Sequence, residues 1–315
     1  MLVDVIIPTY RPDEKLLTIV NKLREQTVKP NRIVLINTEQ KYLDNLLRGR
    51  SYDTTGKYFE VKNVSAREFD HGATRNEGAK GSTADYLLYL TMDALPADDR
   101  LIEKMAAEFK NTGVAAVYAR QLPYEDASPG ERFSRSFNYP ETSCIKSKED
   151  KSRLGIKTYF CSNACAMYDR EVFEKLGKFP SGMIFNEDMV FAHTLIENGY
   201  SIAYAADATV YHSHNYTNMQ QFHRNFDLAV SQAMHPEVFE GVSSESEGRS
   251  YVKDAFSYFI REKRPFYFIT FAFACAFRLA GYRLGKMYEK LPRKVILWCT
   301  ASPNYFSKNR SLKDE

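Results

Sequence analysis

The stretch "ADYLLYLTMD", residues 84–93, decides the fold class of this chain. Apolar and aromatic residues follow one another from 86 to 90 without alternation, which is typical of a strand buried on both faces of a sheet. The run ends at a single carboxylate, Asp93, and ligands of open α/β sheets bind beyond the carboxyl ends of the strands. The side chain of Asp93 can therefore project to where a cation or a phosphate would lie. An aspartate before a proline-containing turn is also a common loop residue, so both interpretations stay open.

Two similar runs precede this strand, "VDVIIP" at 3–8 and "NRIVLINT" at 31–38. Between them, residues 14–26 place apolar side chains at helical spacing, and a further helical stretch is expected from about 75 to 80. Strands that alternate with helices predict an α/β fold with a mostly parallel central sheet and flanking helices.

Strands and helices continue downstream, interrupted by a long polar connection at 124–156. Such a connection inside a compact domain is usually functional or disordered. The other elements expected are a helix at 101–110, a strand at 114–123, a strand and a helix within 158–177, a helix at 186–200, one or two strands within 201–217, and helices from 218 to the end.

The length of 315 residues allows one large domain, or one domain with an appendage. The net charge of +3 is unevenly distributed, because residues 261–315 hold 12 Lys and Arg against 4 Asp and Glu. The basic character therefore belongs to the C-terminal segment. Aromatic residues are interleaved with these basic ones, but no nucleic-acid-binding motif accompanies them, and nucleic acid is not expected as a partner.

Five cysteines without CxxC spacing indicate a reduced, cytosolic protein rather than a disulfide scaffold. Cys161 and Cys165 are expected to be small core residues. The start of the chain is typical of a strand and not of a signal peptide. The longest apolar run, 266–277, has 12 residues and is shorter than the roughly 20 that span a bilayer. We therefore expect a chain that does not cross a membrane by itself.

Polar residues stand at four predicted strand ends, where a sheet would present them to a ligand. They are Thr9 and Tyr10 after Pro8, Asn37, Asp93, and the pair His212 and His214. The two histidines point the same way if the segment is extended, although a bend would separate them. Aspartate and histidine with open water positions favour Mg²⁺ or Mn²⁺, because no thiolate cluster is offered for zinc.

Two acids, Glu187 and Asp188, stand at the start of a predicted helix. A positioned carboxylate can act as a general base, but acids in a first turn also stabilise the helix dipole by roughly 0.3–1 kcal/mol. Adjacent acids diverge on a helix, so at most one of them is expected to face a cleft.

Another pair of polar residues, Arg75 and Asn76 in "HGATRNEGAK", lies at a glycine-flanked helix start. Its position suits the oxygens of a diphosphate. A surface arginine beside a helix cap explains the same residues equally well.

In order along the chain, several motifs resemble the inverting family 2 glycosyltransferases of GT-A fold, namely "VIIPTY", "REQTVKP", "IVLINT", "TRNEGA", "LLYLTMDALP", "EKLGKFP" with "NEDM", and "VYHSHNYT". Finer features, among them "FDHGATRN", "RQLPYEDASPGERF", "FNYP" and "AGYRLGKMYEKLP", are similar to the bacterial rhamnosyltransferases of that family. The resemblance implies a Rossmann-like GT-A domain at 1–230 that binds a nucleotide sugar and carries catalysis. A helical, basic and aromatic region at 231–315 would follow it.

For the metal and the catalytic residues, the resemblance implies specific roles. Asp93 matches the metal-binding acid of the family's DxD motif, in which Thr91 here replaces the first acid. His212 matches the histidine that completes the metal site, and His214 is its neighbour. Asp188 matches the catalytic base, with Glu187 beside it.

For the donor, the resemblance implies contacts from residues at the first strand ends. Asn37 matches an acid that contacts the base of the nucleotide, and Arg75 and Asn76 match a segment near the donor phosphates. The expected donor site also includes Pro8, Thr9, Tyr10, Thr91 and Asp93.

The C-terminal region alternates basic and apolar residues at helical spacing, with Arg283, Lys286, Lys290 and Lys294 after the aromatic run. Such helices are typical of attachment to an anionic membrane surface. Helices that pack on the catalytic domain, or on a second subunit of a homo-oligomer, show the same pattern.

The resemblance implies a metal-dependent, inverting glycosyltransferase using Mg²⁺ or Mn²⁺. It would move L-rhamnose from dTDP-L-rhamnose onto a lipid-linked saccharide of the cell surface, at the cytoplasmic face of the bacterial inner membrane. Two alternatives stay open. The same fold can use a galactofuranose or hexose donor, and the degenerate DxD motif is compatible with a non-catalytic protein that binds nucleotide sugars or acts as a membrane scaffold.

Overall fold

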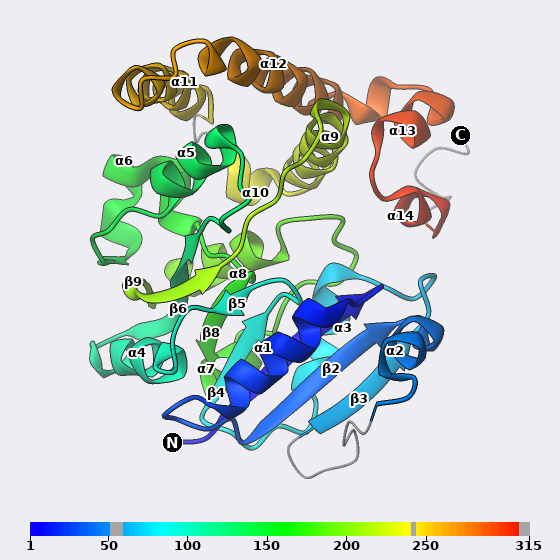
Figure 1. Ribbon diagram of the computed structural model, residues 1–315, viewed down its shortest axis with the longest axis vertical. Coiled ribbons are helices and arrows are strands. Elements are labelled where there is room, and N and C mark those ends of the chain that lie inside the picture. The colour runs from blue at the N-terminus through cyan, green and yellow to red at the C-terminus, as the bar shows by residue number, and fades with distance from the viewer. Residues whose placement is uncertain (51–58, 241–243, 309–315) are drawn as a thin grey trace. The chain divides into compact units, whose positions relative to one another are not determined.

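The computed structural model describes residues 1–50, 59–240 and 244–308 (Figure 1). They form two compact units. The first comprises Met1–Tyr124, Tyr139–Gly182 and Glu187–Ser213, and the second comprises Glu125–Asn138, Met183–Asn186 and the residues from His214 on. The second unit thus begins before the boundary expected at 230 and takes in two short segments from the N-terminal part of the chain.

The first unit is built on one sheet, which has nine strands within the described ranges. Their order is β3-β2-β1-β4-β8-β6-β9-β5, with β7 paired to β9. The strands are β1 Val3–Tyr10, β2 Arg32–Thr38, β3 Phe59–Val64, β4 Tyr86–Leu90, β5 Leu95–Pro96, β6 Val114–Leu122, β7 Cys144–Lys146, β8 Cys165–Asp169 and β9 Ser201–Tyr211.

The direction of the strands confirms the α/β class but corrects one expectation. Strands β3, β2, β1 and β4 form a parallel block, and β6 runs parallel to β9. Strand β8 is antiparallel to both of its neighbours, β4 and β6, and β5 and β7 are antiparallel to β9. The sheet is therefore mixed, because parallel pairing holds for the N-terminal strands and for β6 with β9 but not for β5, β7 and β8.

Helices flank this sheet, and Figure 1 shows α1 lying across one face of it. They are α1 Glu14–Arg24, α2 Gln40–Leu47, α3 His71–Ala79, α4 Leu101–Ala107, α6 Lys151–Leu154, α7 Arg170–Lys175 and α8 Glu187–Glu197. The sequence determines where α1 begins, because the Asp13 carboxylate accepts from the N–H of Lys15 and caps the helix start. Its Leu16, Ile19, Val20 and Leu23 are buried against the strands. Cys161 and Cys165 are also buried, as expected.

The second unit is helical. It contains α5 Pro129–Asn138, α9 Asn218–Met234, α10 Pro236–Phe239, α11 Ser244–Arg261, α12 Tyr267–Lys286, α13 Arg293–Cys299 and α14 Pro303–Lys308. Helix α5 falls in the polar stretch that was expected to be irregular. Its Phe133 is buried against Phe259 of α11 and Phe271 of α12, far away in the sequence. The expectation of helix beyond residue 308 lies outside the described residues.

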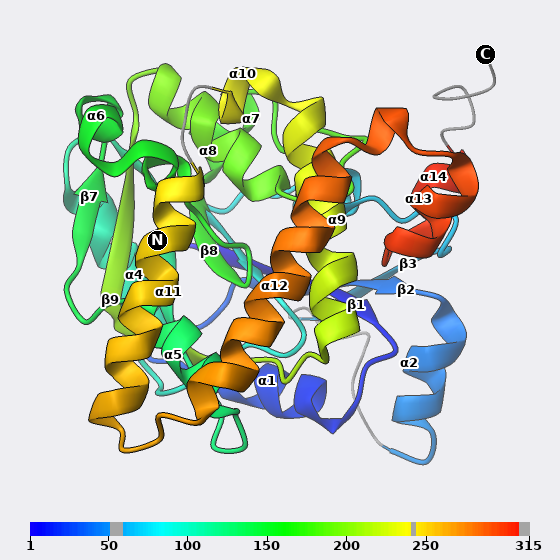
Figure 2. The ribbon, with the colours of Figure 1, turned by 90° about the horizontal axis from the view of Figure 1, so that it is seen from above.

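Two glycines bring α12 against α9, and Figure 2 shows the two helices side by side. A Cβ atom at Gly281 would lie 2.2 Å from the carbonyl oxygen of Phe222, and one at Gly285 would lie 2.3 Å from that of Phe226. Helix α12 therefore contacts α9 through Gly281 and Gly285, which are four positions apart, at a distance that only glycine permits. One face of α12 is thus buried against another helix of the same unit.

Another face of the C-terminal helices remains exposed and apolar. Phe266 is 83% exposed, and Ile269 and Phe273 on α12 are more than half exposed. Within the described ranges, no helix combines the length and the apolar character needed to cross a membrane.

Candidate active site

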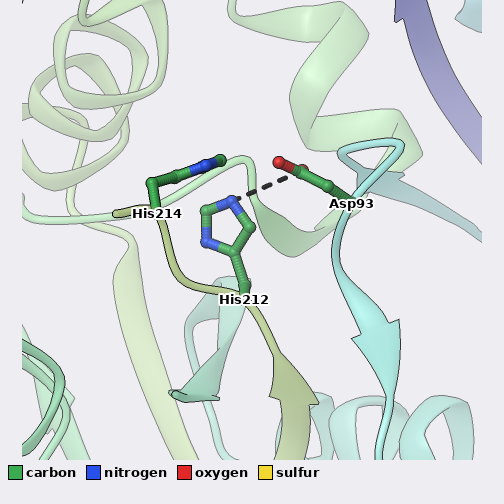
Figure 3. A group of neighbouring side chains, drawn as sticks. All are labelled: Asp93, His212 and His214. Carbon is green, nitrogen blue, oxygen red and sulfur yellow. Dashed lines mark ion pairs between the residues drawn. The ribbon is translucent and has the colours of Figure 1, made fainter. Parts of the chain in front are cut away.

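The short strand β5 brings Asp93 to His212. After β4 ends at Leu90, the chain turns through a hydrogen bond from the N–H of Ala94 to the carbonyl of Thr91 (3.1 Å). β5 then pairs with the end of β9, so that Leu95 lies opposite Tyr211. Asp93 precedes β5 and His212 follows β9, and Nε2 of His212 lies 3.4 Å from Oδ1 of Asp93 (Figure 3).

His214 joins these two residues. Asp93, His212 and His214 can each offer one ligand atom such that all three atoms lie within 4.8 Å of one another. Figure 3 shows the three side chains gathered at the end of β9. One carboxylate with two imidazoles leaves coordination positions for water and for phosphate oxygens. These mixed nitrogen and oxygen ligands suit a divalent transition metal such as Mn²⁺ better than Mg²⁺, which prefers oxygen ligands alone.

Gln121, which the sequence analysis did not identify, orients His212. Its Oε1 lies 2.7 Å from Nδ1 of His212. Because an amide oxygen only accepts, Nδ1 donates the hydrogen, and Nε2 of the neutral ring carries the lone pair. Nε2 is the nitrogen on the side of Asp93. The only signal in the sequence was a polar residue near the end of an apolar strand, and Gln121 is indeed buried.

By the resemblance described above, Thr91 replaces the first acid of the DxD motif. Its backbone N–H donates to the carbonyl of Ala164 (3.1 Å), but its hydroxyl is buried and has no hydrogen-bond partner among the described residues. An unmade hydrogen bond of this kind costs about 1–3 kcal/mol. The hydroxyl is therefore a group beside Asp93 that a bound ligand can satisfy.

Asp188 is a half-buried hydrogen-bond acceptor at the start of α8. Its two oxygens accept from the backbone N–H groups of Asn163 (3.0 Å) and Met189 (2.8 Å). Burial and the neighbouring Glu187 raise the pKa of Asp188 to about 7. A carboxylate whose pKa lies near neutrality is well suited to take a proton from an alcohol in the transition state.

The carboxylate of Glu187 contacts polar side chains. Its Oε1 accepts from Nδ2 of Asn163 (3.1 Å) and lies 3.1 Å from Nη1 of Arg75. Burial alone would raise the pKa of Glu187, but Arg75 and His71 outweigh it and hold that pKa below its usual range. Glu187 is thus a buried anion that stabilises the protonated form of Asp188.

Arg75 contacts Glu187 of the acid pair. It is buried, and its Nη1 also donates to the carbonyl of His71 (2.9 Å). The start of α3 can lie this close to the segment before α8 because residue 72 is glycine: a Cβ there would lie 1.8 Å from the carbonyl oxygen of Pro180. Nε of Arg75 has no hydrogen-bond partner within the described ranges. Its contact with a donor phosphate stays a prediction.

The adjacent residues Ser162 and Asn163 connect the two groups of side chains. Ser162 Oγ accepts from Nε2 of Gln121 (3.0 Å), which holds His212. Asn163 holds Asp188 through its N–H and Glu187 through its amide. Neither residue was singled out from the sequence, where "CSNAC" was notable only for its cysteines.

The expected donor residues fall into buried and exposed sets. Asn37 is fully buried, accepting from the hydroxyl of Thr9 (3.1 Å) and donating to Asn63 (2.8 Å). Asn76 exchanges two hydrogen bonds with the backbone of Phe179 (2.8 and 3.1 Å). These contacts are structural, and a donor contact by Asn37 or Asn76 stays a prediction.

Tyr10, by contrast, is exposed at the end of β1, directly after half-buried Pro8 and buried Thr9. Its ring packs edge-on against Tyr42 at 5.6 Å, and the guanidinium of Arg11 lies over both rings at 5.1 and 5.2 Å. Arg11 and Tyr42 were not identified from the sequence. Together the three present flat surfaces of the kind that nucleobases stack on.

The sequence model of the family described as "Glycosyl transferase family 2" matches residues 4–177. Two relatives match almost the whole chain. The O-antigen chain rhamnosyltransferase RfbN of Salmonella typhimurium is 36% identical over 98% of this chain and 96% of its own length. The O-antigen chain rhamnosyltransferase WbaN of Salmonella anatum is 36% identical over 96% of this chain and 95% of its own length.

Solved structures share the fold at low identity. TarS of S. aureus, residues 1–349 in complex with UDP-GlcNAc, has a TM-score of 0.51 and 15% identity over 92% of both chains. The mannosyltransferase PcManGT of Pyrobaculum calidifontis, in complex with GDP-Man and Mn²⁺, has a TM-score of 0.53 and 15% identity over 99% of this chain and 88% of its own.

Proposed function

The chain belongs to glycosyl transferase family 2, and from that premise we propose that it transfers L-rhamnose from dTDP-L-rhamnose to a lipid-linked cell-surface polysaccharide. The observation that supports this most strongly is the near-full-length similarity to two O-antigen chain rhamnosyltransferases, together with a half-buried Asp188 whose raised pKa suits a base. Half-buried Asp188, held beside buried Glu187 and Asn163, favours an enzyme over a non-catalytic binding protein.

In the proposed reaction, Asp188 takes the proton of an acceptor hydroxyl. The hydroxyl oxygen forms a bond to the anomeric carbon of rhamnose from the side opposite the diphosphate, and the bond from that carbon to the phosphate oxygen breaks. The products are the inverted rhamnoside, dTDP and a protonated Asp188. Backbone N–H groups of Asn163 and Met189 fix the carboxylate, so that its geometry is set before the acceptor arrives.

Asp93 and His212, with His214, would hold a divalent cation, which offsets the charge of the diphosphate when it is bound. Gln121 keeps Nε2 of His212 free of hydrogen for this role. Tyr10, Arg11 and Tyr42 offer a stacking surface for the nucleobase. The hydroxyl of Thr91 is a further contact for the donor.

The purified protein with dTDP-L-rhamnose tests the proposal. Release of dTDP is expected, accelerated by a lipid-linked saccharide acceptor, and NMR of the product should show the inverted anomeric configuration. Parallel reactions with UDP-galactofuranose and UDP-glucose test the alternative donors. A chain that turns over another sugar and not rhamnose refutes the donor, and a chain that turns over none of them refutes an enzymatic role.

We also propose peripheral attachment to the anionic cytoplasmic face of the membrane. Phe266, Ile269 and Phe273 are exposed beside the basic residues Arg261 and Arg264. Apolar side chains beside basic ones favour an anionic lipid surface. Cosedimentation with vesicles of anionic and of zwitterionic lipid tests this.

Binding that needs anionic lipid should be lost in Phe266→Ser/Phe273→Ser. It should be retained in the control Leu279→Ser, which changes another exposed apolar residue further along α12. Equal vesicle binding by the wild type, the double variant and the control would refute this surface as the membrane contact. If the protein is a dimer in solution, and the control remains a dimer while the double variant does not, the surface contacts a second subunit instead.

A further inference from the structure

The helical unit contains a cavity that the proposed reaction does not use. It has a volume of about 140 Å³ and lies between the start of α5, the segment before α9 and the first half of α12. A cavity of similar size in an engineered protein admits a benzene ring, so there is room here for one six-membered ring. His214 of the metal cluster is one of its lining residues.

On one side, the cavity offers a buried hydrogen-bond acceptor. Oε1 of Glu131 accepts from Nε of Arg135 (2.7 Å) and from the N–H of His214 (3.3 Å), and lies 2.6 Å from Nη2 of Arg135. Oε2 receives no hydrogen bond from the described residues. Glu131 is 7% exposed and lines the cavity, so this oxygen is left for a ligand.

On another side, the cavity offers donors. Arg278 donates from Nε to Oε1 of Gln221 (3.1 Å) and from Nη1 to the hydroxyl of Tyr251 (2.9 Å). Its Nη2 and the Nε2 of Gln221 make no hydrogen bond to any described residue. Because Gln221 and Tyr251 fix the guanidinium, these donors are positioned before a ligand binds.

The remaining wall is aromatic. Phe271 is buried, and the ring of Tyr216 is stacked on His214 with centroids 4.8 Å apart. Gly130 allows α5 to approach Phe271, because a Cβ there would lie 3.3 Å from the ring. An apolar ring face next to fixed donors and acceptors matches a pyranose, which has apolar C–H faces and hydroxyl groups that both donate and accept.

We propose that this cavity binds one sugar residue of the saccharide acceptor. A phosphate or nucleotide would be repelled by Glu131, and an alkyl chain would leave the polar atoms unpaired. A neutral polyhydroxyl ring satisfies both the carboxylate and the guanidinium. The inference rests on the proposed transfer to a polysaccharide, and it assigns part of the acceptor's recognition to the helical unit.

Saturation-transfer NMR tests the cavity without turnover. The probes are methyl α-L-rhamnopyranoside, methyl α-D-mannopyranoside and methyl β-D-galactopyranoside, with thymidine diphosphate present to occupy the donor site. At least one glycoside should receive saturation in the wild-type protein. Thr270→Trp, which fills the cavity from the exposed surface of α12, should abolish the signal, whereas Ser257→Trp on α11 outside the cavity should keep it.

Glu131→Gln should weaken binding about tenfold, the effect of losing one good hydrogen bond. Binding that survives Thr270→Trp, or a wild-type protein that binds none of the glycosides, overturns the proposal. These outcomes are separate from those of the transfer assay: a protein that binds a glycoside here but releases no dTDP keeps the cavity assignment and loses the catalytic one.

Discussion

Oε1 of Gln121 lies 2.7 Å from Nδ1 of His212 and thereby fixes which ring nitrogen can coordinate a metal. Through Ser162 and the adjacent Asn163, the same line of hydrogen bonds reaches Asp188. The candidate metal ligand and the candidate base are therefore held by one stretch of backbone. A substitution at Ser162 would therefore disturb the positions of both His212 and Asp188.

Gln121→Leu should lower the affinity for Mn²⁺ about 10–100-fold, the usual effect of removing the residue that orients a metal-binding histidine. Isothermal titration with Mn²⁺ measures this directly, without turnover. Gln121→Glu is the matched control, because its carboxylate still accepts from Nδ1. Equal Mn²⁺ affinity in the leucine variant and the wild type would mean that Gln121 does not position His212.

Asp188→Asn should reduce the rate of transfer about 10²–10⁴-fold, because an amide cannot take the proton of the acceptor. Binding of thymidine diphosphate, measured by titration, should change little. Asp207→Asn, which alters an exposed acid on β9, is the control and should keep the wild-type rate. An Asp188→Asn variant with substantial turnover would remove Asp188 from the mechanism.

The pH dependence of transfer should report the raised pKa of Asp188. The base acts only when deprotonated, so kcat/KM should rise with pH and level off above about 7. Glu187→Gln removes the anion that raises this pKa, and the rise should then move to lower pH. A profile that is already level at pH 5, or that does not move in Glu187→Gln, contradicts the assignment.

The sequence predicted the positions of the site better than its contacts. Asp93 and His212 were identified from strand ends, and the structure brings them together because β5 pairs with β9. That strand has two residues, Leu95 and Pro96, too few to show a pattern. Gln121 and Asn163 were missed because their roles depend on side chains 91 and 25 residues away in the chain.

For the fold as well, local patterns in the sequence were predictable and long-range pairings were not. Continuous apolar runs predicted β1, β2 and β4, whereas the reversed direction of β8 leaves no trace in local periodicity. Helix α5 was missed because its Phe133 is buried by residues of α11 and α12, which lie far away in the sequence.

Gly281→Ala should destabilise the helical unit although alanine favours helix. The new Cβ would overlap the carbonyl oxygen of Phe222, and overpacking of this kind costs about 1–3 kcal/mol. Gly248→Ala on α11 is the matched control: no atom lies within 4 Å of its Cβ position, so it should stabilise by up to about 1 kcal/mol. Fluorescence of the single tryptophan, Trp298 on α13, follows unfolding of this unit. Equal unfolding midpoints for the two variants would refute the close contact between α12 and α9.

Asp227 should make the helical unit less stable as pH rises. Its carboxylate is 2% exposed and accepts from the hydroxyl of Thr300 (2.5 Å) and the N–H of Ala301 (3.1 Å). Burial outweighs these bonds and raises the pKa of Asp227 from 3.8 to about 6. The folded chain therefore holds the proton more tightly than the unfolded chain, and its stability must fall between about pH 4 and pH 6.

The size of this effect follows from the shift, which corresponds to about 3 kcal/mol at 1.36 kcal/mol per pH unit. Urea unfolding followed by Trp298 at several pH values measures the free energy of unfolding. Asp227→Asn does not titrate, so the wild-type value minus the variant value should decrease across this window and become constant above it. Other acids titrate in both proteins and cancel in the difference. A difference that is flat from pH 4 to pH 7 would show that Asp227 is ionised in the folded chain as readily as in the unfolded one.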